Sequence, residues 1–321
     1  MNIGQLIIEN KLKLENGKID EAQLESELII MHILNLNKTN LLLNLNTKIT
    51  NQQIKENNLI IKKRLKRIPL AYILNYKYFY KSKFYTDESV LIPRQETEIL
   101  VEICSNLIKN EIGSFKILEV GIGSGAITGS LAHLFQSKNI EYIATDININ
   151  SLHVAKMNVL KLNKSAKLNL VHNDLLKGVK GSYKFVISSP PYLSIDEMKN
   201  IKTELKFEPK EALHGGTEGH EVCENILIQL AESTVEFENL ILEINPTNTQ
   251  YLLKIIKKLF QNYFKYVIKD YNKQNRFILI TQKEVSQYLN KFNYCPNWKN
   301  LPSVFIDGAT IISALCMSLI E

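Results

Sequence analysis

The first part of the chain places its apolar residues at the spacing of amphipathic helices. Between residues 22 and 65 they recur every three or four positions, and Asn and Thr residues interrupt the pattern near 37–40 and 47–51. The pattern predicts a small helical domain over residues 1–70. We interpret the lysine-rich run 62–67 as a solvated helix face.

The next stretch changes its period. From Tyr72 to Val90 the residues are rich in aromatic and β-branched side chains with alternating polarity, which predicts a β-hairpin. Pro93 is expected to end the strand, and the acidic residues Glu96 and Glu98 are expected to open a helix. Residues 71–92 are thus predicted to form a hairpin linker between the helical domain and the part that follows.

The rest of the chain alternates short apolar runs with helical patterns, which predicts buried strands separated by helices. The predicted elements are strands at 115–120, 141–147, 168–174, 183–189, 238–244 and 275–281, with helices at 126–135 and ending at 162. Such alternation indicates an α/β fold, a mostly parallel sheet with helices on both faces, over residues 93–282. Ligands of this architecture bind at the carboxyl ends of the strands.

Composition narrows the class of protein. The 321 residues suit one catalytic domain with a smaller accessory domain, and 45% hydrophobic and 22% charged residues are ordinary for a globular protein. The net charge of +6 permits a nucleic-acid partner without requiring one. The cysteines stand far apart with no metal-ligand spacing, so we expect no metal site and a reducing, cytoplasmic location.

The end of the chain carries no recognisable signal. Residues 283–321 form a C-terminal extension of unknown role, and their apolar stretch 309–320 is too short to span a bilayer. The N-terminus has no apolar core of signal-peptide length. We therefore expect a soluble protein, most simply a monomer, with no membrane partner.

Glycines follow the first predicted strand of the sheet. Its end and the turn after it contain Glu119, Gly121, Ile122, Gly123, Ser124 and Gly125. Glycine lets the backbone approach a ligand without interference from Cβ, and this turn leads into a helix. The spacing is G-x-G-x-G, which differs from the G-x-G-x-x-G turn of dinucleotide-binding proteins. We predict that these residues bind a cofactor.

Acidic residues at the ends of neighbouring strands indicate which cofactor. Glu119 precedes the turn, where its carboxylate can face the amino group of a methionine moiety. Asp146 ends the second strand, where it can accept ribose hydroxyls, and Asp174, followed by Leu175, ends the third, where it can accept the adenine amine. Each aspartate alone is as readily a helix cap. Together they fit a cationic sulfonium ligand without phosphates, so the predicted cofactor is S-adenosylmethionine, with S-adenosylhomocysteine as its product.

The fourth strand runs into a rigid loop. Its residues are Ser189, Pro190, Pro191 and Tyr192, and we predict that they are catalytic, with Ser189 also beside the cofactor. Consecutive prolines freeze the backbone and remove two N–H donors, while the tyrosine supplies an aromatic wall. Methylation of a planar nitrogen needs its N–H hydrogens accepted at a side chain and a rigid carbonyl, which orients the nitrogen toward the methyl carbon.

From about residue 20 to 282 the chain resembles the release-factor glutamine N5-methyltransferases, the HemK or PrmC family. The segments that carry the resemblance are RIPLAYILNYKYFY, LIPRQETEILVE, ILEVGIGSGA, the Pro-Pro-Tyr loop, KFEPKEALHGGTEG, LILEI, and Arg276 by the closing strand. The resemblance implies a class I, Rossmann-like methyltransferase whose helical N-terminal domain recognises the substrate. It also implies methylation of the glutamine in the Gly-Gly-Gln loop of class 1 peptide chain release factors.

The family's catalytic loop normally begins with Asn, whereas this chain has Ser189, which keeps an acceptor oxygen. Ser-Pro-Pro-Tyr also resembles the loop of N4-cytosine DNA methyltransferases. Three alternatives follow: methylation of an exocyclic amine of DNA or RNA, methylation of another protein side-chain nitrogen, and a scaffold that binds cofactor or a partner without turnover.

Some residues outside these motifs have two readings. One prediction for Arg94 and Glu96 is that they line the mouth of the cofactor site. The alternative is that they form an exposed salt bridge or start a helix. Phe207 and Glu208 suit contact with the substrate, or, for Phe207, packing.

Overall fold

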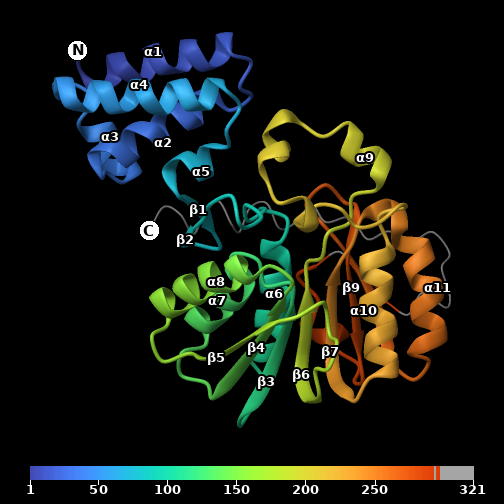
Figure 1. Cartoon of the computed structure of the whole chain (residues 1–321). Helices are drawn as coiled ribbons and strands as arrows, with labels where there is room; N and C mark the ends of the chain where they lie inside the picture. Colours follow the sequence, from blue (N-terminus) through green and yellow to red (C-terminus); the bar gives the residue numbers. More distant parts are fainter. Residues whose placement is uncertain (293, 297–321) are drawn as a thin grey trace.

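A computed structural model describes residues 1–292 and 294–296 and shows a helical bundle above an α/β unit, with a β-hairpin between them (Figure 1). The bundle helices are α1 (Ile3–Asn16), α2 (Ala22–Leu34), α3 (Lys38–Leu43), α4 (Asn51–Leu65) and α5 (Leu70–Leu74). Capping boxes at Asn2 and Thr50 start α1 and α4. Asn10 and Asn57 exchange two buried hydrogen bonds that fix these helices in register.

The interpretation of residues 62–67 as a solvated helix face is wrong for Arg64. Its side chain is buried and donates to both carboxylate oxygens of Glu25 on α2, at 2.7 and 3.2 Å. Arg64 also contacts Glu204, which belongs to a segment far along the chain and is shared with Arg67. This part of the run therefore binds the bundle to the α/β unit.

The hairpin is shorter than predicted. Its strands are β1 (Tyr76–Phe79) and β2 (Ser82–Tyr85), whereas Tyr72 lies in α5 because the apolar run 70–74 completes a turn of helix. Phe79 and Phe84 are fully buried, meet edge to face at 5.9 Å, and belong to the core of the α/β unit. The hairpin thus anchors the bundle to that core.

The α/β unit is built on an eight-stranded sheet with the strand order β10-β8-β9-β7-β6-β3-β4-β5. The strands are β3 (Phe115–Val120), β4 (Ile140–Asp146), β5 (Lys167–His172), β6 (Gly181–Ser188), β7 (Val235–Glu243), β8 (Phe264–Lys269), β9 (Asn275–Thr281) and β10 (Tyr294–Pro296). The pairs from β5 through β7 are parallel, and β9, β8 and β10 add antiparallel pairs. The mostly parallel sheet was predicted; β8 and β10 were not.

Helices cover both faces of the sheet, as Figure 1 shows. The helices α6 (Glu98–Ile108), α7 (Ala126–Leu134) and α8 (Ile149–Leu162) pack with one another, while α10 (Glu221–Glu232) packs with α11 (Thr249–Leu259). Each group contributes to its own buried apolar cluster. Among the described residues, no helix has the length and apolarity that crossing a membrane demands.

A long connection joins β6 to α10. We call residues 193–219 the strap; it contains α9 (Ile195–Lys199) and the 3₁₀ helices η1 (Thr203–Phe207) and η2 (Lys210–Ala212). Two more 3₁₀ helices, η3 (Pro246–Asn248) and η4 (Ser286–Tyr288), follow β7 and β9. The apolar stretch 309–320 and most of the C-terminal extension lie outside the described residues.

Candidate active site

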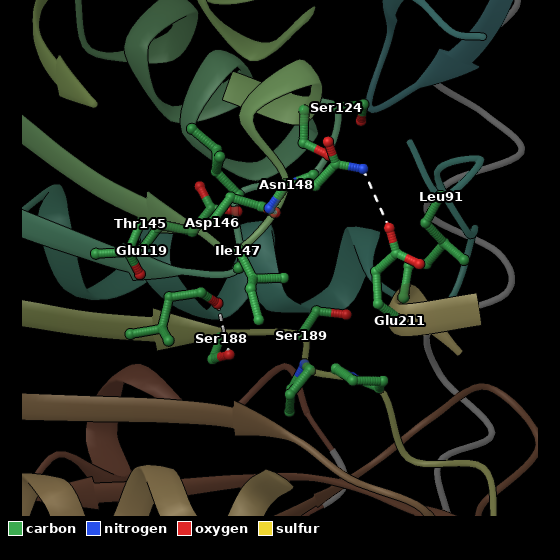
Figure 2. Close-up of a pocket in the computed structure, with 18 of the residues that line it drawn as sticks. Leu91, Glu119, Ser124, Thr145, Asp146, Ile147, Asn148, Ser188, Ser189 and Glu211 are labelled. Carbon is green, nitrogen blue, oxygen red and sulfur yellow. Dashed lines mark hydrogen bonds between the residues drawn. The ribbon is translucent and has the colours of Figure 1, made fainter. Parts of the chain in front are cut away.

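A cavity of about 410 Å³ opens at the carboxyl ends of β3, β4 and β6, where the architecture predicts a ligand. Figure 2 shows side chains from these strands and from the strap facing it. Of the predicted site residues, the cavity wall contains Glu119, Gly121, Ile122, Gly123, Ser124, Asp146, Asp174, Leu175, Ser189, Pro190 and Pro191. The fold therefore brings most of the predicted site together.

The glycine turn combines open backbone with one packing contact. Gly121, Gly123 and Gly125 all have positive φ, at 75°, 52° and 76°. A Cβ at Gly121 or Gly123 would project into open space, whereas one at Gly125 would meet Cα of Ala155 at 2.9 Å. Gly125 is absent from the cavity wall, so within the described residues its role is to bring α7 against α8.

Asp146 holds the turn. Its Oδ2 accepts the Gly123 N–H at 2.9 Å, and its Oδ1 accepts the Asn148 N–H at 2.9 Å. Burial raises the pKa of Asp146, while these two backbone hydrogen bonds oppose the rise. The carboxylate is thus fixed in the cavity wall with lone pairs left for hydroxyl donors.

Glu119 is a buried carboxyl on β3. Burial raises its pKa to about 8, although hydrogen bonds from the side chain and backbone of Thr128 oppose the rise. A cationic group in the cavity would favour its ionised form. The site therefore supplies a carboxyl whose charge depends on what stands beside it.

Asp174 is less enclosed than the other two acidic residues. It lies two residues beyond the end of β5, its side chain is 47% exposed, and it forms an ion pair with Lys177. Its neighbour Leu175 takes a left-handed backbone conformation, with φ at 54°, and turns the chain into the cavity wall. Both residues border the cavity at its exposed side.

The predicted catalytic loop follows β6. The Ser188 hydroxyl donates to the Val120 carbonyl at 2.7 Å and ties this loop to the glycine turn. Ser189 and the two prolines line the cavity, but Tyr192 does not; its ring centre lies 5.9 Å from the Arg276 guanidinium carbon. Burial raises the pKa of Tyr192, so its hydroxyl keeps its proton.

Glycines of the strap pack against this loop. A Cβ at Gly215 would lie 2.5 Å from the Tyr192 Cα and 2.7 Å from the Pro191 carbonyl oxygen. A Cβ at Gly219 would lie 2.6 Å from the Tyr192 carbonyl oxygen. Backbone packs directly on backbone here, so the loop is held from behind as well as by its prolines.

One residue that contacts the loop was not predicted from the sequence. Glu243, the last residue of β7, is 1% exposed and its Oε2 accepts the Ser189 hydroxyl at 2.8 Å and the Thr97 hydroxyl at 2.9 Å. Burial raises the pKa of Glu243, against the hydrogen bonds and the positive charge of Arg276. The available signal in the sequence was the carboxylate near the end of the strand LILEI.

The strap closes one side of the cavity. Glu211 accepts a hydrogen bond from the Asn148 side chain at 3.1 Å across the opening, as Figure 2 shows. Arg94 lines the cavity and donates to Glu208 at 2.7 Å, and Glu208 also accepts the Ile92 N–H at 3.0 Å. Arg94 thus combines both of its proposed roles.

The other linker and strap candidates lie away from this cavity. Glu96 contributes its carbonyl to the first turn of α6, where Ile99 donates to it, so it serves the helix start. Phe207 is 39% exposed and borders a neighbouring hollow of the surface.

The wall chemistry fits a cationic ligand without phosphates. Carboxyls stand at three strand ends, and open space lies over Gly121 and Gly123, where a ligand can approach the backbone. No group of three or more His, Cys, Asp or Glu side chains suited to a metal occurs within residues 1–292 and 294–296. These features agree with S-adenosylmethionine better than with a pyrophosphate cofactor.

Comparison with known proteins identifies both parts of the chain. Residues 5–74 match the model of the PrmC N-terminal domain, and residues 95–226 match that of the methyltransferase small domain. The release factor glutamine methyltransferase of Dictyoglomus turgidum is 33% identical over 276 residues, covering 85% of this chain and 95% of that protein.

Two further relatives agree. The release factor glutamine methyltransferase of Bacillus cereus is 32% identical, covering 82% of this chain and 93% of its own length. A bifunctional methyltransferase of Rickettsia prowazekii is 30% identical over 87% of this chain, which spans 57% of that longer protein. The chain, with its mostly parallel sheet and helical N-terminal part, therefore belongs to the release factor glutamine methyltransferase family.

Proposed function

We propose that this protein transfers a methyl group from S-adenosylmethionine to the side-chain nitrogen of the glutamine in the Gly-Gly-Gln loop of a class 1 release factor. The observation that carries the proposal is the shared wall between the glycine-turn cavity and the Ser189-Pro190-Pro191 loop. A methyl donor held by the turn and a planar nitrogen held by the loop meet in one cavity. The names of the relatives supply the acceptor.

The cofactor would be held by the strand ends. Gly121 and Gly123 leave room for it, Asp146 would accept its ribose hydroxyls, and Glu119 would face its amino group. Asp174 and Leu175, which line the cavity, would border the adenine. When bound, S-adenosylmethionine supplies an electrophilic methyl group, whose bond to sulfur breaks, with its electron pair left on sulfur, as the acceptor nitrogen bonds to carbon.

The loop would prepare the acceptor. An amide nitrogen is a poor nucleophile because its lone pair is delocalised into the carbonyl. The Ser189 oxygen accepts one N–H hydrogen and a rigid loop carbonyl accepts the other, which turns the nitrogen toward the methyl carbon and stabilises the charge that develops on it. The nitrogen then loses one proton to solvent, and the product is a neutral N-methyl amide.

The bundle would recognise the protein substrate. A groove of about 990 Å³ lies between α2, α4, α5, the hairpin and the strap, and it reaches Arg94 and Glu208 beside the cofactor cavity. We assign recognition to residues 1–70, linkage to 71–92 and catalysis to 93–282, and we assign no role to 283–321. The protein would act as a monomer in the cytoplasm, where translation occurs.

Methyl transfer to recombinant release factor tests the proposal. Labelled S-adenosylmethionine should add one methyl group to the Gly-Gly-Gln peptide, located by mass spectrometry, and a release factor with Asn in place of that Gln should remain unlabelled. Binding of cofactor without transfer would contradict the proposal and favour the scaffold.

Base methylation is the second candidate, because Ser189 begins a Ser-Pro-Pro-Tyr loop. Parallel incubations with DNA and RNA, digested and analysed for modified bases, decide between the two. Modified bases together with an unlabelled release factor would favour the nucleic-acid reaction.

A further inference from the structure

A buried carboxylate lies directly behind the catalytic loop. Ser189 and Thr97 line the cavity, and both donate their hydroxyl hydrogens to the same oxygen of Glu243. Glu243 itself is 1% exposed and is not part of the cavity wall. It therefore does not touch a ligand in the cavity, but it holds two side chains that line it.

The direction of this hydrogen bond determines what Ser189 offers to a ligand. A serine hydroxyl has one proton and two lone pairs. Once the proton is donated to a carboxylate, the oxygen presents only lone pairs on its other side. Donation to a charged acceptor also makes the bond stronger and polarises the hydroxyl.

Charged and neutral groups surround Glu243 and act on its carboxyl in opposite directions. Arg276 on β9 acts on it as an opposite charge and Glu96 as a like charge, while Cys223 of α10 contacts its backbone carbonyl at 3.9 Å. Tyr192, whose ring lies near Arg276, is the neutral neighbour on the loop side. An oxygen that accepts two hydroxyls carries no proton of its own, so the geometry is that of an acceptor.

We propose that Glu243 is a positioning residue that fixes Ser189 as the hydrogen-bond acceptor for the substrate amide. The inference rests on the proposed function, because only an amide or amine N–H requires an acceptor at this place. Glu243 would thus contribute to the reaction by orienting the Ser189 hydroxyl, without contacting the substrate glutamine itself.

The test compares Glu243→Gln with Glu238→Gln. Glu238 lies on the same strand and pairs with Lys184 at 2.8 Å, outside the cavity, so it controls for loss of a strand carboxylate. In Glu243→Gln the introduced side-chain amide can donate to the Ser189 oxygen and free the hydroxyl hydrogen to point at the substrate. We expect kcat for release factor to fall roughly 10²-fold in Glu243→Gln, as for a misplaced catalytic group, and to stay unchanged in Glu238→Gln.

If Glu243 served only the fold, its substitution would weaken substrate and cofactor binding together with kcat. We expect the KM for release factor and the calorimetric Kd for S-adenosylmethionine to stay within about twofold of wild type in Glu243→Gln. In a Ser189→Ala background the same substitution should cause no further loss, because the two residues act as one unit. Should Glu243→Gln not fold, Glu243→Asp, which withdraws the carboxylate by one methylene, carries the same expectations.

Three results would overturn the inference. They are a kcat for Glu243→Gln equal to that of Glu238→Gln, losses that multiply in the Ser189→Ala background, and a parallel loss of cofactor affinity and thermal stability. An inactive wild type would remove the proposed function and this inference with it. If the wild type is active and Glu243→Gln has the same kcat, the proposed function stands and only the role of Glu243 is contradicted.

Discussion

The guanidinium of Arg94 donates to Glu208 Oε1 at 2.7 Å and joins the start of the catalytic part to the strap. The other oxygen of Glu208 accepts the Ile92 N–H at 3.0 Å, and the glutamate is 4% exposed. Ile92 of the hairpin linker and Arg94 just after it therefore depend on one buried carboxylate.

Replacing that carboxylate should destabilise the fold. We expect Glu208→Ala to lower the free energy of unfolding by about 1–3 kcal/mol, since it leaves a buried N–H without its acceptor. Urea denaturation with an unchanged slope measures the effect. Asp20→Ala, which removes the exposed ion pair with Lys202, is the matched control and should leave the midpoint unchanged. Equal midpoints for both variants would contradict the prediction.

Cofactor affinity should rise with pH through the titration of Glu119. Burial raises its pKa to about 8, so the cofactor-free protein holds a proton there that a cationic amino group expels. Affinity for S-adenosylmethionine should increase by up to about tenfold per pH unit below pH 8. Calorimetry in buffers of different ionisation enthalpy should detect one released proton, and Glu119→Gln should release none.

The same carboxyl should make the stability of the cofactor-free protein depend on pH. Its folded-state pKa lies above its unfolded value, so its contribution to stability is full below about 4.5 and is lost as pH rises through about 8. Thermal unfolding should therefore show a Tm that falls as pH rises from about 4.5 to about 8 and levels off above that. Glu119→Gln should flatten this dependence; an unchanged slope in the variant would assign it to other groups.

The two aspartates of the cavity should contribute unequally. Asp146 is tied to Gly123 and Asn148, whereas Asp174 is half exposed and paired with Lys177. We expect Asp146→Ala to raise the Kd for S-adenosylmethionine by about tenfold or more, and Asp174→Ala by less than about threefold. Isothermal titration calorimetry measures both Kd values. A larger increase for Asp174→Ala than for Asp146→Ala would contradict the prediction and indicate that the adenine side contributes more to binding.

Gly215 should tolerate no side chain. A Cβ there would lie 2.5 Å from the Tyr192 Cα, so Gly215→Ala must displace the loop of Ser189, Pro190, Pro191 and Tyr192. We expect kcat to fall by about 10²-fold, with cofactor affinity retained, because a displaced loop misplaces the acceptor. Gly4→Ala, whose Cβ has only ordinary contacts at 3.5 Å and beyond, is the control for the added methyl group.

The Ser189→Asn variant tests how well the family's usual residue supports turnover at this position. Asn offers an acceptor oxygen to the substrate and an amide donor to Glu243. We expect its kcat to stay within about tenfold of wild type, far above that of Ser189→Ala. Inactivity of wild type and Asn variant alike, with cofactor still bound, would favour the scaffold.

The strands that form the cavity were predictable because each is a short segment rich in apolar and β-branched residues that runs into a turn of Gly, Asp or Pro. In β8, which was not predicted, Lys265 is buried, and its ammonium donates to the Tyr263 carbonyl at 2.6 Å. Periodicity assigns a lysine to solvent, and only the folded chain supplies the carbonyl that satisfies it.

The part of the site that escaped prediction depends on long-range contacts. Glu243 is 54 positions from Ser189 and 146 from Thr97. The sequence around a glutamate at a strand end does not show whether its side chain is buried or exposed to solvent. The partners of Arg64 are also distant, at 39 and 140 positions, so its basic run indicated a solvated surface. Motifs at the ends of strands could be read from the chain, whereas the residues that support them could not.

The strap implies an order of events in each catalytic cycle. Its residue Glu204 is held by Arg64 and Arg67 of the bundle, and only a few residues later Glu211 is bonded to Asn148 at the cavity mouth. A protein docked against the bundle would therefore steady the segment that closes one side of the cofactor cavity. The methylated protein would leave first and the spent nucleoside last, so S-adenosylhomocysteine should compete with the methyl donor and not with the release factor.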